Sequence, residues 1–374
     1  MVKLKRQVLV SAMQHIAAGL SAKPVIPVLS GVNVQAGETE LTLTASNIAM
    51  TLQYKAAADG DNLAIEKTGN IVVPARYFMD IVRIIPDEFV TIEEIGNRQI
   101  CIRSGRTVYR LSAMNAEEFP ETGAIENKAG IHIDSDCFKR MVKQVSFAAS
   151  SSESRLMLTG VLFQTDGPNL KLAATDGICL ASRTRNVNAS QTAIFPPTVI
   201  PAKHLYDYSK MISDGSGVTE VALGDNGIRF TTDNFTMHSS LIRGTYPSID
   251  KLTPNRFHSE ITLDTPQFLH AVERVSLLSG EANVVGLRIS LTGIELFARS
   301  EDIGDVTEFI PFEETLLEPM TVSFNGKYMR EIMRAIDSKY TQLKFTGKDK
   351  PIIIQPFDRQ NDLYIITPIR TVSS

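Results

Sequence analysis

Reactive side chains in this sequence of 374 residues are scattered, and none of them completes a known catalytic motif. Its six histidines include no His-Glu-x-x-His pair for zinc, and Gly-x-Ser-x-Gly is absent. Gly326-Lys327 and Gly347-Lys348 lack the upstream glycine and the following Ser or Thr of a phosphate loop. Asp176-Gly177 is first of all a turn signal. The sequence therefore predicts no catalytic site, no metal site and no cofactor.

The cysteines and the apolar segments indicate the compartment. Cys101, Cys137 and Cys179 are odd in number and far apart, which excludes a disulfide framework or a Cys-x-x-Cys metal knuckle. The first twenty residues superficially resemble a signal peptide, but their apolar positions have helical spacing and no convincing cleavage site follows. No apolar run approaches the ~20 residues of a membrane span. We expect a reduced, soluble, cytoplasmic protein without membrane contact.

The sequence concentrates basic residues in its predicted helices. Lys and Arg total 38 against 42 Asp and Glu, a net −4, which argues against a uniformly basic nucleic-acid binder. Six segments with helical spacing, the first widened to 3–23, hold fifteen basic and six acidic residues, which leaves −13 for the rest. The predicted helices are 5–19, 75–85, 135–149, 202–213, 265–279 and 325–337. They are either ordinary solvated faces or a repeated surface that faces phosphates without reading bases.

A threefold repeat organises these helices. Strand-like segments recur at Leu41–Ala45, Leu170–Ala174 and Ile294–Ala298, which start 129 (41 to 170) and 124 (170 to 294) residues apart. Apolar segments that carry Gly31, Gly160 and Gly286 precede them.

A second marker has nearly the same period. Val72–Arg76, Val199–Lys203 and Val322–Lys327 each indicate a strand that runs into a helix, with proline expected in the first helical turn and Asn325 as a cap. A period of one third of the chain is the size of a domain rather than of a solenoid unit. The sequence predicts an α+β fold with antiparallel sheets in three copies, at 1–124, 129–250 and 258–374, joined by polar linkers near 122–130 and 250–259.

Six short motifs occur in order along the chain, at Lys23–Leu29, Val73–Arg76, Arg103–Arg106, Leu158–Phe163, Ala174–Gly177 and Pro368–Arg370. Together they are similar to the motifs of one family, the bacterial DNA polymerase III beta subunits or sliding clamps. The resemblance covers essentially the whole chain. It implies three tandem copies of the DNA-clamp fold, with helices lining a pore and sheets outside, in a ring-shaped head-to-tail homodimer. Such a chain is an accessory subunit rather than an enzyme, and acts in DNA replication as a processivity factor.

The resemblance also assigns contacts to double-stranded DNA, which would be independent of sequence. It implies that Lys23, Arg76 and Lys203 face DNA in the pore, and the basic helix faces add Lys139, Lys143, Lys327, Arg330 and Arg334. A closed ring cannot leave a duplex, so weak contacts suffice. Because the chain has no nucleotide site, loading would require an ATP-driven clamp loader.

Other partners would bind a peptide cleft between the second and third domains. These partners are the replicative polymerase catalytic subunit and other proteins with clamp-binding peptides. The matching positions are Leu158, Thr175, Gly177, Leu180, Pro247, Leu252, Asn325, Tyr328, Ile365, Pro368, Ile369 and Arg370.

Three departures distinguish this cleft from the family pattern. Ile178-Cys179 stands where the family usually has His-Arg, Lys251 replaces a common arginine, and Thr367 replaces a large apolar residue. We therefore expect weaker or altered binding of standard clamp-binding peptides. Cys179 is expected to be a buried, inert thiol rather than a redox switch.

The expected dimer contact has complementary charge. Residues 98–110 hold four arginines and no acid, whereas residues 300–314 hold six acids and no base. The interface residues are Arg103, Arg106, Tyr109 and Leu111 on one side, and Leu277, Leu278, Glu301, Asp305 and Glu308 on the other. The alternative function is a divergent clamp paralogue or clamp-like scaffold that modulates a host clamp without itself encircling DNA.

Overall fold

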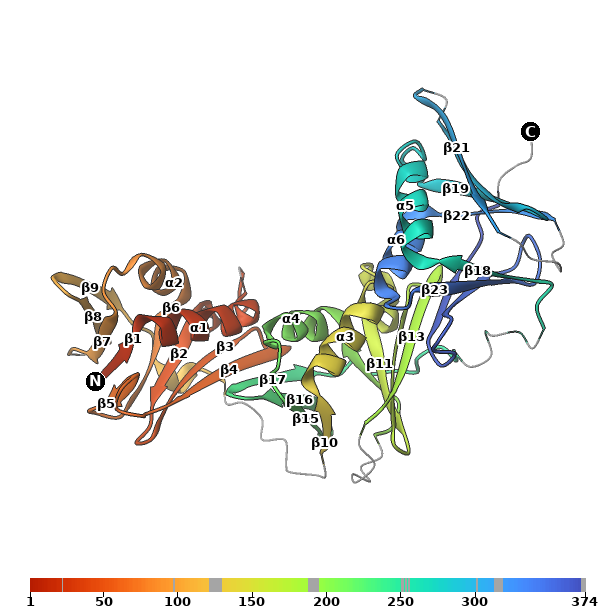
Figure 1. The fold of residues 1–374 in the computed structure, drawn as a ribbon. Coiled ribbons are helices and arrows are strands. Elements are labelled where there is room, and N and C mark those ends of the chain that lie inside the picture. The colour runs from red at the N-terminus through yellow and green to blue at the C-terminus, as the bar shows by residue number, and fades with distance from the viewer. Residues whose placement is uncertain are drawn as a thin grey trace. The chain divides into compact units, whose positions relative to one another are not determined.

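The computed structural model describes residues 1–21, 23–96, 98–120, 130–187, 195–249, 252, 254, 256–300, 302–312 and 319–370 (Figure 1). The first third of the chain contains β1 (Val2–Lys5), α1 (Arg6–Ile16), β2 (Gly31–Ala36), β3 (Glu40–Ser46), β4 (Met50–Ala57), β5 (Leu63–Ile65), β6 (Gly69–Pro74), α2 (Ala75–Ile84), β7 (Phe89–Glu94), β8 (Gln99–Ser104) and β9 (Thr107–Ser112). The second contains β10 (Ile131–Asp134), α3 (Ser135–Ser146), β11 (Gly160–Asp166), β12 (Asn169–Thr175), β13 (Cys179–Asn186), β14 (Thr198–Pro201), α4 (Ala202–Met211), β15 (Val218–Leu223), β16 (Gly227–Thr232) and β17 (Phe235–Ser240). The third contains β18 (Ser259–Asp264), α5 (Thr265–Ser276), β19 (Val284–Ser290), β20 (Gly293–Ser300), β21 (Gly304–Pro311), β22 (Met320–Asn325), α6 (Gly326–Ala335), β23 (Tyr340–Phe345), β24 (Ile352–Pro356) and β25 (Leu363–Ile366). Apart from the short β5, the order of strands and α-helices is the same in each third.

All six predicted helices are present, and several end earlier than expected. In α1 the buried residues Leu9, Ala12, Met13 and Ile16 follow the spacing of one helix face. We expected the third helix to reach residue 149, but α3 ends at Ser146. The amide of Ala149 donates there to the carbonyl of Ser146, a three-residue spacing that tightens the last turn and ends the α-helix.

The proline marker was misplaced by one residue. Pro74 is the N-cap of α2 rather than a residue of its first turn, and β14 likewise ends at Pro201 before α4 begins. Both prolines close an edge strand, where their missing N–H groups break no sheet ladder. The cap predicted at Asn325 is confirmed, because its Oδ1 accepts from the amide of Lys327 at 2.9 Å.

Four antiparallel sheets arrange the strands. Their orders are β5-β1-β7-β8-β9, β10-β15-β16-β17-β4-β3-β2-β6, β14-β11-β12-β13-β25-β24-β23-β18 and β21-β20-β19-β22. Each eight-stranded sheet therefore combines strands from two consecutive thirds, through the pairs β17·β4 and β13·β25. We call these two pairs the internal junctions.

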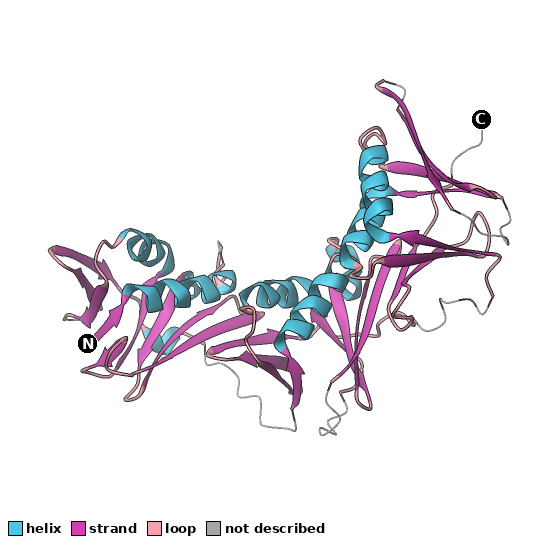
Figure 2. Ribbon diagram, in the orientation of Figure 1, coloured by secondary structure: helices cyan, strands magenta, loops and turns pink. Residues whose placement is uncertain are grey.

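The chain forms two compact units that follow the sheets rather than the repeats. The first unit comprises Met1–Phe138 and Asp207–Leu241, and the second comprises Lys139–Tyr206 and Ile242–Ser374. The division falls within α3 and α4. In the second unit, α5 and α6 lie side by side over the sheet that contains β20 (Figure 2).

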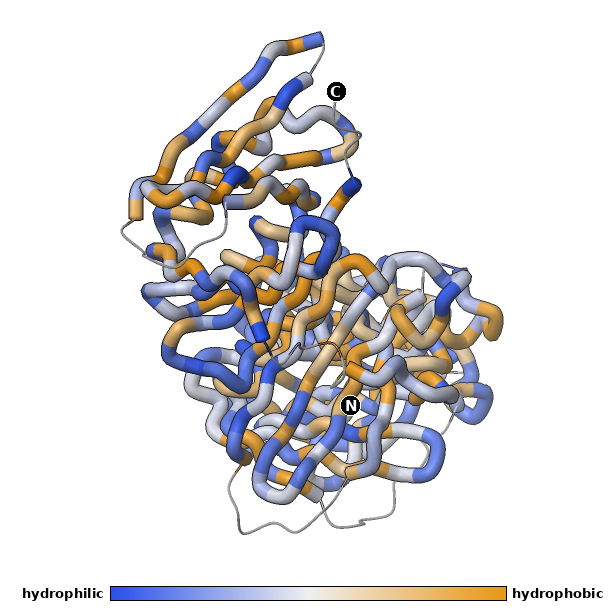
Figure 3. The backbone as a smooth tube through the Cα atoms, turned by 90° about the vertical axis from the view of Figure 1, so that its right-hand side faces the viewer, coloured by the Kyte–Doolittle hydropathy of each residue, from blue (hydrophilic) through white to orange (hydrophobic). Residues whose placement is uncertain are grey.

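The strand registers confirm the repeat. The counterpart pairs are Val34–Leu43, Phe163–Leu172 and Leu287–Leu296, and all six residues are buried. Hydrophobic and hydrophilic residues are interleaved along much of the chain (Figure 3).

The glycine marker needs one refinement. Gly31 and Gly160 each face the proline that ends the neighbouring strand, but the third residue at that position is Val284, which faces Asn325. Gly286 is needed for a different reason, because a Cβ there would lie 2.2 Å from the Phe297 ring.

Candidate functional site

Three cations occupy one repeated position in the helices. Arg76, Lys203 and Lys327 are each the second residue of α2, α4 and α6, and all three side chains are exposed. None of these first turns contains an acid. A helix dipole disfavours cations at its N-terminus by roughly 0.3–1 kcal/mol, so local helix stability does not explain this choice. At α6 the Asn325 side chain already accepts from the amides of Lys327 and Tyr328, so the exposed cation is the feature that all three positions share.

The other predicted DNA-facing residues differ in their surroundings. Lys23 and Lys143 are exposed, whereas Lys139 and Arg330 are half-buried. Arg334 forms ion pairs with Glu273 at 2.7 Å and with Glu331 at 3.2 Å, and these contacts raise the pKa of its guanidinium. Because two carboxylates share its charge, Arg334 offers a phosphate less than the sequence implies.

All the predicted cleft positions lie in the second unit, and two of them belong to a buried apolar cluster that we call the apolar floor. Leu180 on β13 faces Ile365 on β25 across an internal junction, and both are buried. They belong to one hydrophobic cluster, whose other members are Leu162, Ala173, Val199, Tyr246, Ile249 and Ile353. Because β13 belongs to the second repeat and β25 to the third, this apolar floor forms only when those two repeats share a sheet.

The loop from Thr175 to Cys179 joins β12 to β13 and contains two of the predicted cleft positions, Thr175 and Gly177. The Asp176 Oδ1 accepts from the amides of Ile178 and Cys179, both at 2.8 Å, which confirms the turn predicted there. Gly177 has φ +91°, a conformation that side chains rarely adopt. The Thr175 hydroxyl closes the turn, since it donates to the Cys179 carbonyl at 2.7 Å and accepts from the Gly177 amide at 3.0 Å.

Two tyrosines attach this loop to other elements, and sequence reasoning missed both contacts. Tyr328 on α6 donates its hydroxyl hydrogen bond to the Asp176 carboxylate. Burial and this bond raise the pKa of Tyr328. The Tyr246 hydroxyl accepts from the Thr175 amide at 3.1 Å, and burial raises the pKa of Tyr246 to about 12. The partners are 71 and 152 residues apart, so only their hydrogen-bonding chemistry could have suggested the contacts.

Most of the other predicted cleft positions are exposed or half-buried. Ile178 and Leu252 are about half exposed, at 47% and 49%, while Leu158 is half-buried. Pro247 and Arg370 are exposed. The segment that contains Pro368 and Ile369 is held by two backbone bonds, from Thr367 to the Ile178 carbonyl at 2.9 Å and from Ile369 to the Ser323 carbonyl at 2.7 Å. Lys251 lies outside the described residues.

Cys179 is buried, as predicted. Burial, together with the nearby Asp176 carboxylate, raises the pKa of its thiol. A thiol that resists ionisation is a poor nucleophile, so the structure agrees with an inert role.

Four of the nine predicted dimer residues lie on two strands that end their sheets. Tyr109 and Leu111 are half-buried on β9, and Asp305 and Glu308 lie on β21; each of these strands ends its sheet. Leu277 is 78% exposed after α5. Glu301 lies outside the described residues.

Two of the predicted interface charges already have partners within the chain. Arg103 lies 3.8 Å from Glu93. Glu308 accepts from Arg274 Nε at 2.9 Å, and this hydrogen bond lowers the pKa of Glu308. Leu278 is half-buried, and Arg106 is exposed in the turn before β9.

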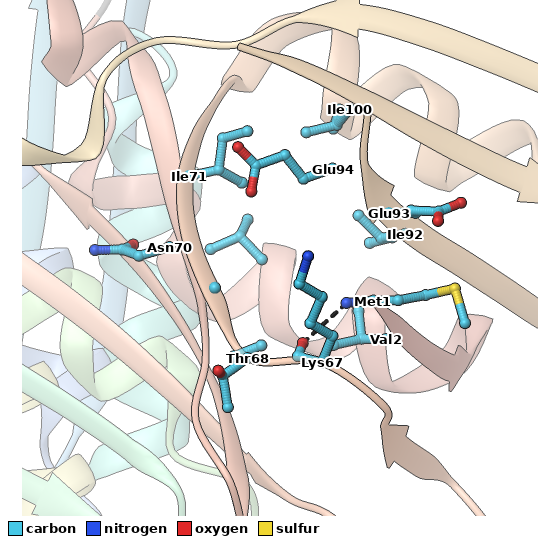
Figure 4. Close-up of a pocket in the computed structure, with 13 residues that line it drawn as sticks. Met1, Val2, Lys67, Thr68, Asn70, Ile71, Ile92, Glu93, Glu94 and Ile100 are labelled. Carbon is cyan, nitrogen blue, oxygen red and sulfur yellow. Dashed lines mark hydrogen bonds between the residues drawn. The ribbon is translucent and has the colours of Figure 1, made fainter. Parts of the chain in front are cut away.

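A separate pocket lies in the first unit between β6, β7 and the N-terminus (Figure 4). The Met1 ammonium donates to the Lys67 carbonyl at 2.9 Å, and Ile71, Ile92 and Glu94 line the cavity. None of the predicted site residues contributes to it.

Within the described residues, no three His, Cys, Asp or Glu side chains gather as a metal site would require. The helices in that part of the chain are too short or too polar to cross a membrane.

Comparison with known proteins covers the whole chain. Three family models match in order, described as the N-terminal, central and C-terminal domains of the DNA polymerase III beta subunit, at residues 1–123, 132–248 and 250–370. The Beta sliding clamp of Bacillus subtilis (strain 168) is 30% identical over 374 residues, with 98% of this chain and 99% of the relative covered. That of Staphylococcus aureus (strain Mu50 / ATCC 700699) is 29% identical, with 98% of each covered.

The crystal structure of the Bacillus subtilis DNA polymerase sliding clamp has a TM-score of 0.95 at 30% identity, covering 99% of both chains. With three copies of the clamp fold and full-length similarity, the chain belongs to the DNA polymerase III beta subunit family, the beta sliding clamps.

Proposed function

We propose that this protein is a DNA sliding clamp that encircles duplex DNA and tethers the replicative polymerase during replication. The observation that carries the proposal is the repeated cation at the start of α2, α4 and α6, on a chain whose net charge is −4. Phosphates bind at such positions without any readout of bases. The family membership points to the same function and gives no support to a scaffold that leaves DNA free.

The sheet orders support a ring made of two copies. In both internal junctions, the strand that follows the repeat hairpin pairs with the last strand of the next repeat. The third repeat offers β21 at that position, and the first repeat offers β9, and both strands are edges. A second copy supplies each missing partner. Such a head-to-tail contact forms a ring when its rotation closes.

The DNA contacts are electrostatic. Cations on the helices attract phosphates in a way that salt screens over about 8–10 Å at physiological ionic strength. Since the closed ring keeps the protein on the duplex, these contacts can be weak enough to permit sliding. The chain acts as an accessory subunit, and a separate ATP-driven loader opens it.

Partner proteins bind the cleft in the second unit through short peptides. Its buried apolar floor and its tyrosine-anchored loop suit a peptide with one or two apolar side chains and a few polar anchors. Ile178, half exposed where the family usually has a polar ring, favours peptides that are more apolar than the standard ones. We propose the domain limits 1–124, 129–250 and 258–374.

The test is retention on circular duplex DNA with a clamp loader, before and after linearisation. We expect the protein to remain on circles and to run off linear DNA. Replacing Lys23, Arg76 and Lys203 together with Glu should abolish retention. The matched control, Lys67, Lys348 and Lys350 to Glu, reverses exposed charges away from the helices and should be retained. Failure of the wild-type chain, beside a retained control clamp, would refute the proposal.

A further inference from the structure

The cavity in the first unit lies between two sheets (Figure 4). Residues of β1, β7 and β8 line it from one sheet, and residues of β2 and β6 line it from the other. Its volume is about 90 Å³. Packed interiors leave few voids larger than a water molecule, so a space of this size beside the core can hold a small ligand.

The walls of the cavity are aliphatic. Val2, Val34, Ile92 and Ile100 are buried, and Ile71 is half-buried. Such walls accept a short branched hydrocarbon group and disfavour a charge deep in the cavity. Because drug-sized ligands need pockets of ~300–1,000 Å³, the group that enters must be small.

One acid stands on this apolar face. Alternate residues of a strand share a face, so Glu94 lies on the same side of β7 as Val90 and Ile92, which are both buried. Glu94 also faces Ile100 on β8. A Cβ on Gly69 would lie 3.9 Å from the Glu94 Oε2, so this carboxylate reaches from β7 to the start of β6.

One cation enters the same cavity. Lys67 lies just after β5, and its side chain extends into the cavity (Figure 4). The backbone here is fixed, because the Met1 carbonyl accepts from the amides of Glu66 and Lys67 at 2.9 and 3.1 Å. Among the described residues, the other two thirds contain no counterpart of β5, so this wall does not belong to the threefold pattern.

Both charges are available to a ligand. Lys67 and Glu94 are exposed, and within the described part of the chain neither side chain forms an ion pair. The adjacent acid differs, since Glu93 lies 3.8 Å from Arg103. The cavity therefore presents one cation, one carboxylate and an aliphatic wall.

We propose that this cavity binds a free α-amino acid with a short branched aliphatic side chain. The side chain packs against Ile71, Ile92 and Ile100, the carboxylate pairs with Lys67, and the ammonium group pairs with Glu94. A simple aliphatic acid or amine would leave one of the two protein charges unpaired, so a zwitterion fits best. We call this cavity the amino-acid site. It shares no residue with the predicted DNA contacts or peptide cleft.

Methyl NMR spectroscopy of the intact chain tests the site, with L-leucine as the probe. A ligand this small should bind with a dissociation constant of about 1 mM. We expect leucine to shift the methyl resonances of Ile71, Ile92 and Ile100. The resonances of Ile261 and Ile354, which are buried in the second unit, should not move.

Three analogues test the ligand class. Isocaproate lacks the ammonium group of leucine and isoamylamine lacks its carboxylate, and each should bind about tenfold more weakly than leucine. Glycine, which lacks the aliphatic side chain, should cause no shift. Equal binding of leucine and either singly charged analogue would overturn the assignment to a zwitterion.

Two variants assign the charges. Glu94→Gln should weaken leucine binding about tenfold and leave isocaproate binding unchanged, because isocaproate has no ammonium group to lose a partner. Lys67→Gln should weaken leucine binding to the same extent and leave isoamylamine binding unchanged. A purely structural loss would weaken all three ligands alike and would contradict these roles. Lys348→Gln and Asp349→Asn, in an exposed turn of the second unit, are the matched controls.

The amino-acid site and the clamp function can fail separately. Absence of shifts in the wild-type chain at about 10 mM leucine, ten times the expected dissociation constant, would refute the site. Shifts confined to methyl groups outside the cavity would refute it too. Retention on circular DNA, measured on the same preparation, reports on the clamp alone.

Discussion

His238 is a half-buried titratable group at the first internal junction. It lies on β17 between Thr51 and Arg229, and its Nδ1 has no hydrogen-bond partner among the described residues. Burial, and then the Arg229 charge, lower the pKa of His238 from 6.5 to about 4. The folded chain therefore keeps this imidazole neutral where the unfolded chain would bind a proton.

This linkage predicts a loss of stability in mild acid. Because the pKa is depressed in the folded state, the full stability is present above pH 6.5 and is lost as the pH falls toward 4. His238→Gln should remove about 2 kcal/mol of the difference in unfolding free energy between pH 7.5 and 4.5. Urea unfolding at the two pH values measures it. His132→Gln, at an exposed histidine on β10, is the control, and an equal effect there would contradict the prediction.

At the residue scale, the sequence predicted hydrogen bonds between neighbouring residues better than contacts between residues far apart in the chain. The turn at Asp176 and the cap at Asn325 follow from local chemistry, and both are present. The hydrogen bond of Asp176 with Tyr328 depends on the third repeat reaching the second, which no local pattern encodes. The ion pairs that partly neutralise Arg334 were missed for the same reason, since Glu273 lies on another helix.

Between strands, the second internal junction contains a buried ionic cluster. Asp362 is fully buried and accepts from Arg185 at 2.7 and 2.9 Å, while Arg183 Nε lies 3.2 Å from the same carboxylate. The counterparts of Arg183 and Asp362 at the first junction are Tyr54 and Phe235, which face each other. One junction is therefore apolar at the position where the other is ionic.

Breaking the cluster should be costly, whereas replacing it should not. Asp362→Asn leaves two arginines without a buried counter-charge and should lower the unfolding free energy by about 3–5 kcal/mol. Arg183→Tyr, Arg185→Ala and Asp362→Phe together copy the first junction, where the counterparts are Tyr54, Ala56 and Phe235, and should recover most of that stability. Thermal unfolding of the intact chain measures both. A triple variant no more stable than Asp362→Asn would show that the two junctions are not interchangeable.

At the element scale, periodicity predicted much of the fold. The three strand motifs and all six helices are present because alternation and helical spacing record which face is buried. The pairing of β4 with β17 and of β13 with β25 was not predicted, because the sequence of a strand does not identify which strand of the next repeat it pairs with. The two compact units follow those pairings rather than the repeats.

At the scale of the whole molecule, charge is separated by element. The six helical segments carry +9 and the remainder carries −13, so phosphates are attracted to the helices and repelled elsewhere. The repeated position gives a two-copy ring six equivalent cations, at Arg76, Lys203 and Lys327 of each chain.

These cations should set the salt dependence of DNA binding. Replacing all three with Gln should reduce the slope of log affinity against log salt by about 0.9 for each phosphate that is no longer neutralised. Titration of a short duplex at several salt concentrations measures the slope. The variant Lys67, Lys348 and Lys350 to Gln should keep the wild-type slope, and equal slopes in all three proteins would place the DNA-binding surface elsewhere.

Because β21 and β9 end their sheets at the positions where β4 and β13 pair with β17 and β25, a ring of two copies would make the covalent chain one way of cutting a cycle of equivalent repeats. The place where the polypeptide begins is then arbitrary with respect to the ring. A circular permutant that starts near residue 130, with a flexible linker from the present C-terminus to Met1, should build the same closed assembly. In that permutant the β17·β4 pair would form between two molecules, and the pair of β9 with β21 would lie within one chain.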